Sequence, residues 1–329
     1  MRYSFIIPVY NRPEEVDELL NSLTRQTNKN FEVLIVEDGS SVPCKEVVDN
    51  YADRLDICYY FKSNSGPGQT RNYGAERGHG EYLIILDSDC ILPEGYLAAV
   101  ESELQRQKAA AFGGPGCADD SFTNIQKAIN YAMTSFFTTG GIRGGKKKMD
   151  KFYPRSFNMG VRAEVYKALG GFSKMRFGED IDFSIRIFQG GYACRLFPEA
   201  WVWHKRRTDL KKFFKQVHNS GIARINLYKK YPESLKVVHL LPALFTIGIV
   251  FLLLCSLVCS WSLSLLLLFA LIICVDSTLR NKSFKIGLLS ILASFIQLIG
   301  YGTGFLRAWW KLCVLGKNEF AAFEKNFYK

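Results

Sequence analysis

The sequence lacks the cysteine patterns of a disulfide framework or a zinc site. It has nine cysteines, but no CxxC pair and no Cys/His cluster at the spacing of zinc ligands. A secretory signal peptide is also missing, because the apolar stretch from Phe5 to Val9 is short and is interrupted by Pro8. We therefore expect the first 236 residues to remain in the cytoplasm.

Charge is missing from two long parts of the C-terminal third. No Asp, Glu, Lys or Arg occurs from Val237 to Val275, or from Ile286 to Leu306. Each stretch reaches the roughly 20 residues that a membrane-crossing helix needs. We predict two crossings in the first stretch, with a turn near Ser260-Trp261-Ser262. The second stretch is either a third crossing or a re-entrant helix, because its glycines permit both.

The remaining sequence is basic, with a formal net charge of +11. Basic residues cluster between Arg143 and Lys151 and between Lys205 and Lys215. Each cluster is either an ordinary solvated surface or a contact with anionic lipid head groups. No nucleic-acid-binding module accompanies the charge, so we expect membrane lipids and no nucleic acid as partners.

Short apolar strands alternate with helices in the N-terminal region. The predicted strands are Tyr3 to Val9, Phe31 to Val36, Ile57 to Phe61 and Tyr82 to Leu86, with helices at Pro13 to Gln26 and Gln69 to Arg77. This order predicts an α/β fold with a mostly parallel sheet and helices on both faces. In such sheets, ligands bind beyond the carboxyl ends of the strands.

Three segments follow from these patterns. Residues 1–207 are predicted to form a cytoplasmic catalytic domain, and 237–329 a membrane region with two or three transmembrane or re-entrant helices. Between them, residues 208–236 include an amphipathic helix at Thr208 to Tyr231, which we expect to lie flat on the bilayer surface. The predicted protein is therefore integral to the cytoplasmic membrane, with its catalytic domain on the cytoplasmic side.

Asp87-Ser88-Asp89 directly follows a predicted buried strand. Two carboxylates one residue apart can share Mg²⁺ or Mn²⁺ with a diphosphate, because these cations prefer oxygen ligands and leave positions open. Such a triplet is weak evidence alone, since many are ordinary loop residues, but its position at a strand end favours a metal site. His204 follows another predicted strand and is either a further metal ligand or a structural histidine.

Two further groups favour nucleotide binding. Asp38 ends a predicted strand, where its carboxylate is either a nucleobase or ribose contact or a turn residue. The segment Asn64 to Gly68 is a glycine-containing loop that leads into a helix carrying Arg71. Its glycines permit close approach of a ligand, and a helix N-terminus favours an anion.

Glu179-Asp180 begins another predicted helix. A carboxylate here is either a general base for an attacking hydroxyl or a charge that complements the helix dipole.

In these motifs the sequence resembles the family-2 glycosyltransferases, which have the GT-A fold. The matching stretches are Ile7-Pro8-Val9-Tyr10-Asn11, Val36-Glu37-Asp38-Gly39-Ser40, Asn64 to Asn72, Asp87-Ser88-Asp89, Asn158-Met159-Gly160 with Gly170-Gly171-Phe172, and Gly178-Glu179-Asp180. Together they span most of residues 4–224.

The resemblance implies an inverting transfer of a sugar from a nucleotide-sugar donor, without a covalent intermediate, and with Asp180 as catalytic base. The donor-binding residues that it implies are Pro8, Tyr10, Asn11, Asp38, Gly68, Arg71, Asp87, Ser88 and Asp89. On the acceptor side it implies Asn158, Met159, Gly160 and Glu179. Asp87, Asp89 and His204 would hold Mg²⁺ or Mn²⁺.

Processive members of the family carry a Gln-x-x-Arg-Trp stretch, whereas this chain reads Gln216-Val217-His218-Asn219-Ser220-Gly221. We therefore expect a single sugar to be added, in cell-surface glycan assembly, to a hydroxyl of a lipid-linked saccharide or glycolipid. Transfer to polyprenyl phosphate is an alternative, in which the attacking phosphate oxygen needs no base. A nucleotidyltransferase and a non-catalytic membrane scaffold are less favoured.

The basic segment Gly140 to Lys151 is expected to close over the acceptor or bind its diphosphate. Replacing Lys146, Lys147 and Lys148 with Ala should raise the apparent KM for a lipid-linked acceptor, because three cations that attract its phosphates are lost. Steady-state kinetics at varied acceptor concentration measure this, and an unchanged KM would remove the idea.

Overall fold

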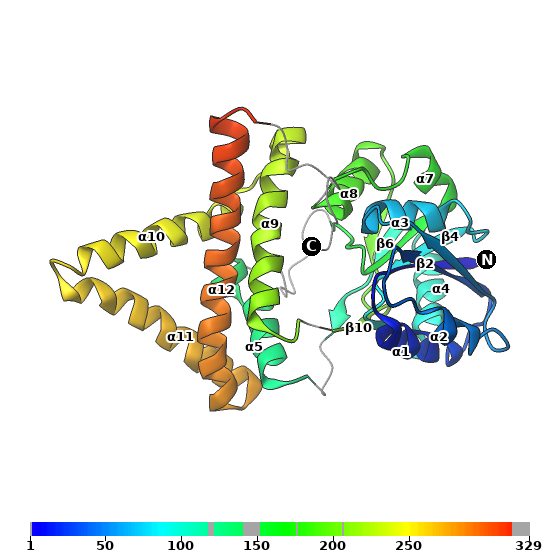
Figure 1. Cartoon of the computed structure of the whole chain (residues 1–329), viewed down its shortest axis with the longest axis horizontal. Coiled ribbons are helices and arrows are strands. Elements are labelled where there is room, and N and C mark those ends of the chain that lie inside the picture. Colours follow the sequence, from blue (N-terminus) through cyan, green and yellow to red (C-terminus); the bar gives the residue numbers. More distant parts are fainter. Residues whose placement is uncertain (1, 118–121, 141–151, 176, 206, 318–329) are drawn as a thin grey trace. The chain divides into compact units, whose positions relative to one another are not determined.

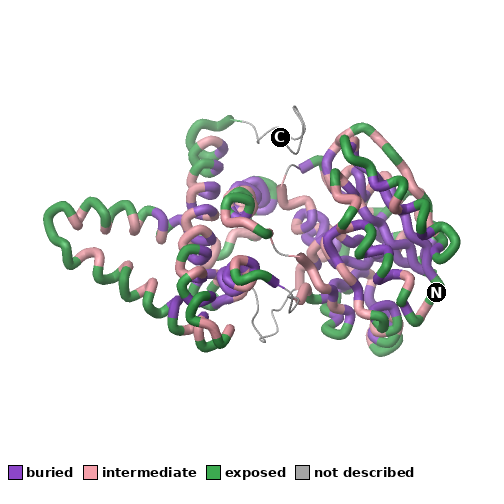
Figure 2. The backbone as a smooth tube through the Cα atoms, turned by 60° about the horizontal axis from the view of Figure 1, so that its bottom comes forward, coloured by how far each residue is buried: buried purple, intermediate pink, exposed green. Residues whose placement is uncertain are grey.

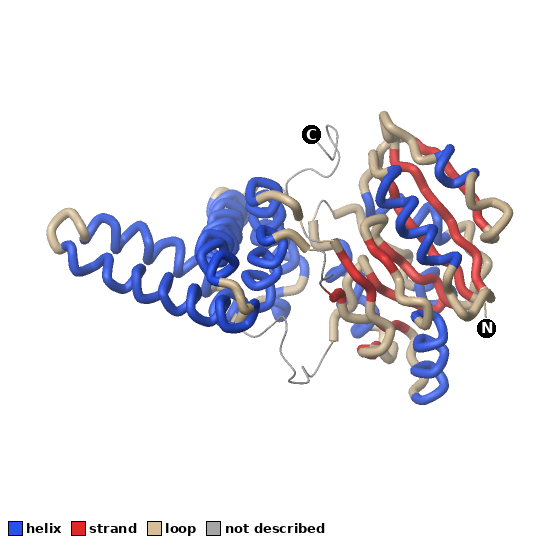
Figure 3. The backbone as a smooth tube through the Cα atoms, turned by 90° about the horizontal axis from the view of Figure 1, so that it is seen from below, coloured by secondary structure: helices blue, strands red, loops and turns tan. Residues whose placement is uncertain are grey.

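The computed structural model describes residues 2–117, 122–140, 152–175, 177–205 and 207–317. These residues form two compact units. Unit 1 contains the described residues up to 117 and from 152 to 205, and unit 2 contains 122–140 and 207–317. All described strands belong to unit 1, whereas unit 2 is helical (Figure 3). Of the predicted acceptor loop, residues 141–151 lie outside the described residues.

Unit 1 is built on a seven-stranded sheet with the order β3-β2-β1-β4-β8-β6-β9. These strands are β1 (Tyr3–Val9), β2 (Phe31–Asp38), β3 (Ile57–Lys62), β4 (Tyr82–Leu86), β6 (Ala111–Gly113), β8 (Asn158–Arg162) and β9 (Cys194–Leu196). The first four are mutually parallel, and β8 runs antiparallel to both of its neighbours. A second, three-stranded sheet contains β5 (Cys90–Ile91), β10 (Val202–His204) and β7 (Gly116–Cys117). The predicted mostly parallel α/β sheet is confirmed.

Helices cover both faces of the larger sheet, as predicted. Alternate residues of β1 point to opposite faces, so Phe5 and Ile7 belong to one hydrophobic cluster and Ile6 to the other. The first cluster is completed by α1 (Pro13–Thr24), α2 (Lys45–Asp49) and α4 (Tyr96–Arg106). The second is completed by α3 (Pro67–Ala75), α7 (Ala163–Ala168) and α8 (Glu179–Gln189). The central strands β1, β2 and β4 are consequently buried almost throughout, whereas the edge strand β3 is only partly buried (Figure 2).

Unit 2 is organised around one long helix. Its helices are α5 (Asn124–Thr134), α6 (Phe136–Thr139), α9 (Leu210–Lys230), α10 (Leu241–Cys255), α11 (Ser264–Asn281) and α12 (Phe284–Trp309). α12 contacts α5, α9, α10 and α11 (Figure 1). Residues of α5, α9 and α12, including Ile129, Phe213 and Ala293, share one hydrophobic cluster. Ser135 separates α5 from α6.

Glycines bring the backbones of α9 and α12 together. A Cβ at Gly304 would lie 2.0 Å from the carbonyl oxygen of His218, and one at Gly221 would lie 2.2 Å from that of Tyr301. Small residues permit such close helix contacts in membrane proteins. Packing against α12 therefore accounts for the buried face of α9, and the flat position of α9 on a bilayer stays a prediction.

Two segments among the described residues are long and apolar enough to cross a membrane. They are Ser260–Asn281, with mean hydropathy 2.2, and Phe284–Val314, with mean hydropathy 1.6. The helix α10 has only 15 residues, or about 22 Å at 1.5 Å per residue, which is less than the roughly 30 Å of a hydrocarbon core. The predicted turn near Ser260 is confirmed as a short 3₁₀ helix, Ser260–Leu263. The length criterion thus selects α11 and α12, whereas the sequence predicts both crossings within Val237 to Val275 and leaves Ile286 to Leu306 open.

Gly160 in β8 provides a test of the packing in unit 1. A Cβ there would lie 2.0 Å from the ring of Phe112, which is buried and stacked on Phe197. We expect Gly160→Ala to lower the free energy of unfolding by about 1–3 kcal/mol, the usual cost of overpacking a core. Thermal and denaturant unfolding measure the change.

The matched control is Gly95→Ala. Gly95 precedes α4 with φ −91°, and an added Cβ would meet no atom within 4 Å. This variant should unfold like the wild type. Equal stability of both variants would show that β8 and β6 do not pack as described.

Candidate active site

Several predicted site residues meet at one edge of the larger sheet. Because β1, β2 and β4 are parallel, their carboxyl ends place Tyr10, Asp38 and Asp87 at the same edge. β8 is antiparallel to β4 and begins there, with Asn158 paired to Leu86. The edge thus combines segments from residue 10 to residue 158.

Asp38 is buried and organises the loop that leads into α3. Its Oδ1 accepts a hydrogen bond from the backbone N–H of Ser65 (2.8 Å), and its Oδ2 accepts one from Gly66 (2.9 Å). Nζ of Lys62 lies 2.5 Å from Oδ1. Gly66, at φ +87°, is the residue before α3, and Pro67 begins the helix. Asp38 therefore has a structural role, and its contact with a nucleotide stays a prediction.

Arg71 in α3 connects two of the predicted acidic groups. Its guanidinium lies 2.8 Å from Oδ1 of Asp87 and 3.1 Å from Oε1 of Glu179. Its side chain is only 5% exposed, and the ring of Phe172 lies 5.4 Å away. Burial acts to lower the pKa of Arg71, but the surrounding carboxylates outweigh it and raise that pKa. The guanidinium therefore remains charged and joins the turn after β4 to the start of α8.

Glu179 and Asp180 occupy the first turn of α8. Burial and the adjacent charge of Asp180 raise the pKa of Glu179, and Arg71 opposes that rise. Asp180 makes an ion pair through Oδ2 with Nε of Arg155 (2.7 Å), and Oδ1 accepts from the N–H of Ile181 (2.8 Å). The two adjacent carboxylates are thus held by different arginines.

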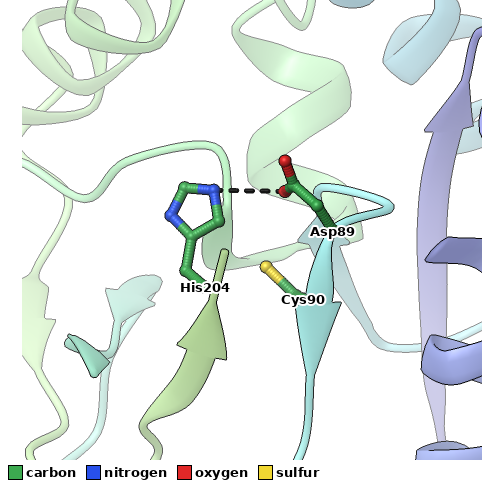
Figure 4. Close-up of side chains that lie close together, drawn as sticks. All are labelled: Asp89, Cys90 and His204. Atoms are coloured by element: carbon green, nitrogen blue, oxygen red, sulfur yellow. Dashed lines mark ion pairs between the residues drawn. The ribbon is translucent and has the colours of Figure 1, made fainter. Parts of the chain in front are cut away.

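Asp89 connects the β4–β5 turn with two other segments. Its Oδ2 accepts from Arg12, just after β1, at 2.9 Å. Its Oδ1 lies 3.2 Å from Nε2 of His204, at the end of β10 (Figure 4). Nδ1 of the same ring is buried and has no hydrogen-bond partner within the described part of the chain. A carboxylate oxygen and an imidazole nitrogen suit Mn²⁺ or a similar cation, so Asp89 and His204 fit a metal site.

The candidate ligand set differs from the predicted one in two residues. Asp89, Cys90 and His204 each offer a ligand atom, and these atoms lie within 4.8 Å of one another. Asp87 is not in this group, because its carboxylate pairs with Arg71. Cys90 was missed, since nothing in the sequence order brings it beside His204; only the pairing of β5 with β10 does so.

The predicted acceptor residues of β8 lie inside the fold. The amide of Asn158 donates to the carbonyl of Ala200 (2.8 Å), and its oxygen accepts from Tyr96 (2.7 Å). Met159 belongs to the second hydrophobic cluster of unit 1, and Gly160 lies against Phe112. These side chains support the edge from within, and their contact with an acceptor stays a prediction.

The remaining predicted donor residues surround the same loops. Asn11 has φ +53°, and its side-chain oxygen accepts from the N–H of Val42 (2.9 Å). Gly68 lies beside Glu179, since an added Cβ would be 3.3 Å from Cγ of that residue. Pro8 is the sixth residue of β1, and Ser88 is buried between the two aspartates.

One contact path joins the whole site. It runs from Asp38 through Gly66 to α3, from Arg71 to both Asp87 and Glu179, and along the β4–β5 turn to Asp89 and His204. The acidic groups therefore belong to one connected site.

Comparison with known proteins identifies the class. The sequence model of the glycosyl transferase family 2 matches residues 4–170, and the chain belongs to this family. It is 27% identical over 248 residues to the glycosyltransferase AglE of Haloferax volcanii, covering 71% of this chain and 79% of that protein. It is 30% identical over 193 residues to an uncharacterized glycosyltransferase of Haemophilus influenzae, covering 56% and 62%.

Other curated relatives match only in part. A Rickettsia felis glycosyltransferase is 42% identical over 88 residues, and the match spans 15% of its length. Among solved structures, the mannosyltransferase PcManGT from Pyrobaculum calidifontis, in complex with GDP-Man and Mn²⁺, has a TM-score of 0.65 at 17% identity. That likeness covers 93% of this chain and 87% of the other, and it supports the GT-A fold.

Arg71 provides a test of the charge network. Arg71→Met removes a buried cation and leaves Glu179 without its charged partner, so we expect a loss of about 3–5 kcal/mol in the free energy of unfolding. Urea unfolding at pH 7 measures it.

The loss should shrink at acidic pH. The pKa of Glu179 in the folded protein is raised above its ordinary 4.5, and without Arg71 it rises further. A raised carboxyl pKa costs stability where the unfolded state is ionised, above about 4.5, and the cost disappears as falling pH protonates the folded group. A difference that is independent of pH between 7 and 4.5 would contradict the pairing.

Proposed function

We propose that the protein is an inverting glycosyltransferase that moves one sugar from a nucleotide-sugar donor to a hydroxyl of a lipid-linked saccharide or glycolipid at a membrane surface. The observation that carries this proposal is the guanidinium of Arg71, which brings the β4–β5 turn and the carboxylates of α8 to one place. The donor-binding and acceptor-binding groups must lie close together, because the acceptor hydroxyl attacks the same sugar carbon atom from which the nucleoside diphosphate departs.

The donor diphosphate would bind between α3 and the β4–β5 turn. The N-terminus of α3 favours an anion, and Arg71 adds a buried positive charge five residues along the chain from Gly66. Nε of Arg71 is buried and has no hydrogen-bond partner within the described residues, so one donor is left for a phosphate oxygen. The other donor-binding residues proposed are Pro8, Tyr10, Asn11, Asp38, Gly68, Asp87, Ser88 and Asp89.

Asp89 and His204 would hold a divalent cation, Mg²⁺ or Mn²⁺, with Asp87 close in sequence. When bound, the cation offsets the negative charge that develops on the departing nucleoside diphosphate. Arg12 keeps the Asp89 carboxylate oriented toward His204, since it binds the other carboxylate oxygen. A neighbour of the same fold was solved with GDP-Man and Mn²⁺, which is consistent with this role.

Asp180 is proposed as the base that takes the proton of the acceptor hydroxyl. It lies at the start of α8, adjacent to Glu179, which Arg71 joins to the donor side. Its ion pair with Arg155 holds the carboxylate in place, and Oδ2 exchanges that contact for the hydroxyl of an arriving acceptor. Glu179 and residues 158–160 are proposed to line the acceptor side.

The apolar helices of unit 2 support a membrane location. The hairpin of α10 and α11 exposes large apolar side chains on both arms and at its tip, such as Leu253, Val258 and Leu268. An apolar surface of this size is unfavourable in water, whereas the hydrocarbon chains of a lipid bilayer would cover it. Arg280 lies in the last turn of α11, and Lys282 and Lys285 follow it, so the positive-inside rule favours the cytoplasmic side for this end of the hairpin. That orientation requires both arms of the hairpin, α10 and α11, to enter the membrane together.

The test compares two neighbouring carboxylates in full-length, detergent-solubilised protein. A panel of nucleotide sugars with Mn²⁺ and a lipid-linked acceptor identifies the reaction. Asp180→Asn should then lower kcat by about 10²- to 10⁴-fold, the usual contribution of a general base, and leave donor affinity unchanged. Glu179→Gln, the matched control, should instead raise the KM for the acceptor.

Each other outcome points elsewhere. If Asp180→Asn is nearly silent with a polyprenyl phosphate acceptor, the attacking group is a phosphate oxygen and the alternative reaction is correct. If Glu179→Gln causes the large loss in kcat, the base is Glu179. If no donor in the panel is turned over, the alternative of a non-catalytic membrane scaffold is correct.

A further inference from the structure

The second sheet of unit 1 places a thiol at the candidate metal site. β5 and β10 are antiparallel, with Cys90 directly opposite His204. Side chains of directly opposite residues lie on the same face of a sheet. Asp89 lies in the turn just before β5 and pairs with His204, so the carboxylate, thiol and imidazole offer ligand atoms within 4.8 Å of one another (Figure 4).

Phe157 holds both the thiol and the imidazole in position. Its backbone carbonyl accepts a hydrogen bond from Sγ of Cys90 at 3.4 Å. Its ring stacks on the ring of His204, with centroids 4.6 Å apart and planes 14° apart. Cys90 is fully buried, so its thiol is not a solvent-exposed group that happens to lie near the site.

This donor set differs from one made only of carboxylates. Mg²⁺ prefers oxygen ligands, whereas Zn²⁺ binds cysteine, histidine and aspartate, commonly with three protein ligands and one position left open. Thiolate ligands select softer cations. The group Asp89, Cys90 and His204 therefore has the composition and number of ligands of an open zinc site.

We propose that Cys90 is a third metal ligand beside Asp89 and His204, and that its thiolate increases the preference of the site for Zn²⁺ over Mn²⁺. On binding, the thiol loses its proton to solvent and exchanges its hydrogen bond with Phe157 for a bond from sulfur to the metal. The fourth position stays open for an oxygen of water or of a diphosphate. The inference depends on the proposed function only in that Asp89 and His204 hold a cation.

Tight binding of Zn²⁺ alone does not establish the thiol ligand. Any site of nitrogen and oxygen ligands binds Zn²⁺ more strongly than Mn²⁺, following the general order of divalent metal affinities. The distinguishing property is the bond to sulfur, which Co²⁺ reports because cobalt bound to thiolate absorbs in the near ultraviolet. Co²⁺ also accepts the tetrahedral ligand sets that Zn²⁺ occupies.

The experiment titrates full-length, detergent-solubilised protein with Co²⁺, without donor or acceptor. The wild type should develop a thiolate-to-cobalt absorption band that Zn²⁺ removes by competition. Cys90→Ser should lose the band, and Cys194→Ser should retain it. Cys194 is a matched control, because its buried thiol likewise lies near a backbone carbonyl, that of Phe152.

Competition between metals provides a second measurement. Cys90→Ser should lower the Zn²⁺ affinity by more than the roughly 10- to 100-fold that loss of an outer-shell partner costs. Its Mn²⁺ affinity should change much less, since Mn²⁺ gains little from a sulfur ligand. Cys90→Asp replaces sulfur with oxygen and should keep metal binding while shifting the preference toward Mn²⁺.

A wild-type protein that binds Co²⁺ without the band overturns the proposal, whatever the variants do. A band that persists in both Cys90 variants also overturns it, because the sulfur then comes from another cysteine. Since no substrate is present, these results are independent of transfer. A Cys90-dependent band in a protein without transferase activity would support the metal site and count against the proposed function.

Discussion

The site depends on one buried guanidinium. The ion pairs of Arg71 join α3 both to the turn after β4 and to the start of α8. A charge at 5% exposure is stable only when opposite charges surround it, and Asp87 and Glu179 meet that need. The same requirement draws three segments together that lie far apart in the chain. The edge of the sheet is thus shaped by electrostatic pairing as well as by the strands.

The other carboxylates follow the same rule. Asp38 is paired with Lys62, Asp89 with Arg12 and Asp180 with Arg155. In the proposed reaction, the nucleoside diphosphate is itself an anion, so it would compete with these carboxylates for the cations, and a divalent metal would relieve the repulsion between them. The ion pairs therefore keep the acidic groups in place, and under the proposed function the donor and the metal would exchange with them.

Unit 2 is held by a different kind of interaction. Its helices are apolar over long stretches, and the backbones of α9 and α12 approach closely at glycines such as Gly221 and Gly304. At the base of the hairpin, Phe245, Phe269 and Phe295 from α10, α11 and α12 lie with ring centroids 5.2–5.8 Å apart. Beyond this cluster the hairpin exposes apolar surface, which a lipid environment would cover. The apolar composition of the hairpin explains why lipid would surround it. The small size of the glycine side chains explains how closely α9 and α12 pack.

The sequence alone predicted the first four strands and the helices α1 and α3, because apolar strand patterns and strand-ending acidic motifs are local signals. It also located Asp38, Asp87, Asp89, Glu179 and His204, because each lies beside a predicted strand or helix end. Only the tertiary structure decided which groups pair. Segments distant in the chain determine the antiparallel direction of β8, the position of Cys90 opposite His204, the internal hydrogen bonds of Asn158 and the packing of α9 on α12. Such contacts follow from strand register and helix packing, which local patterns do not specify.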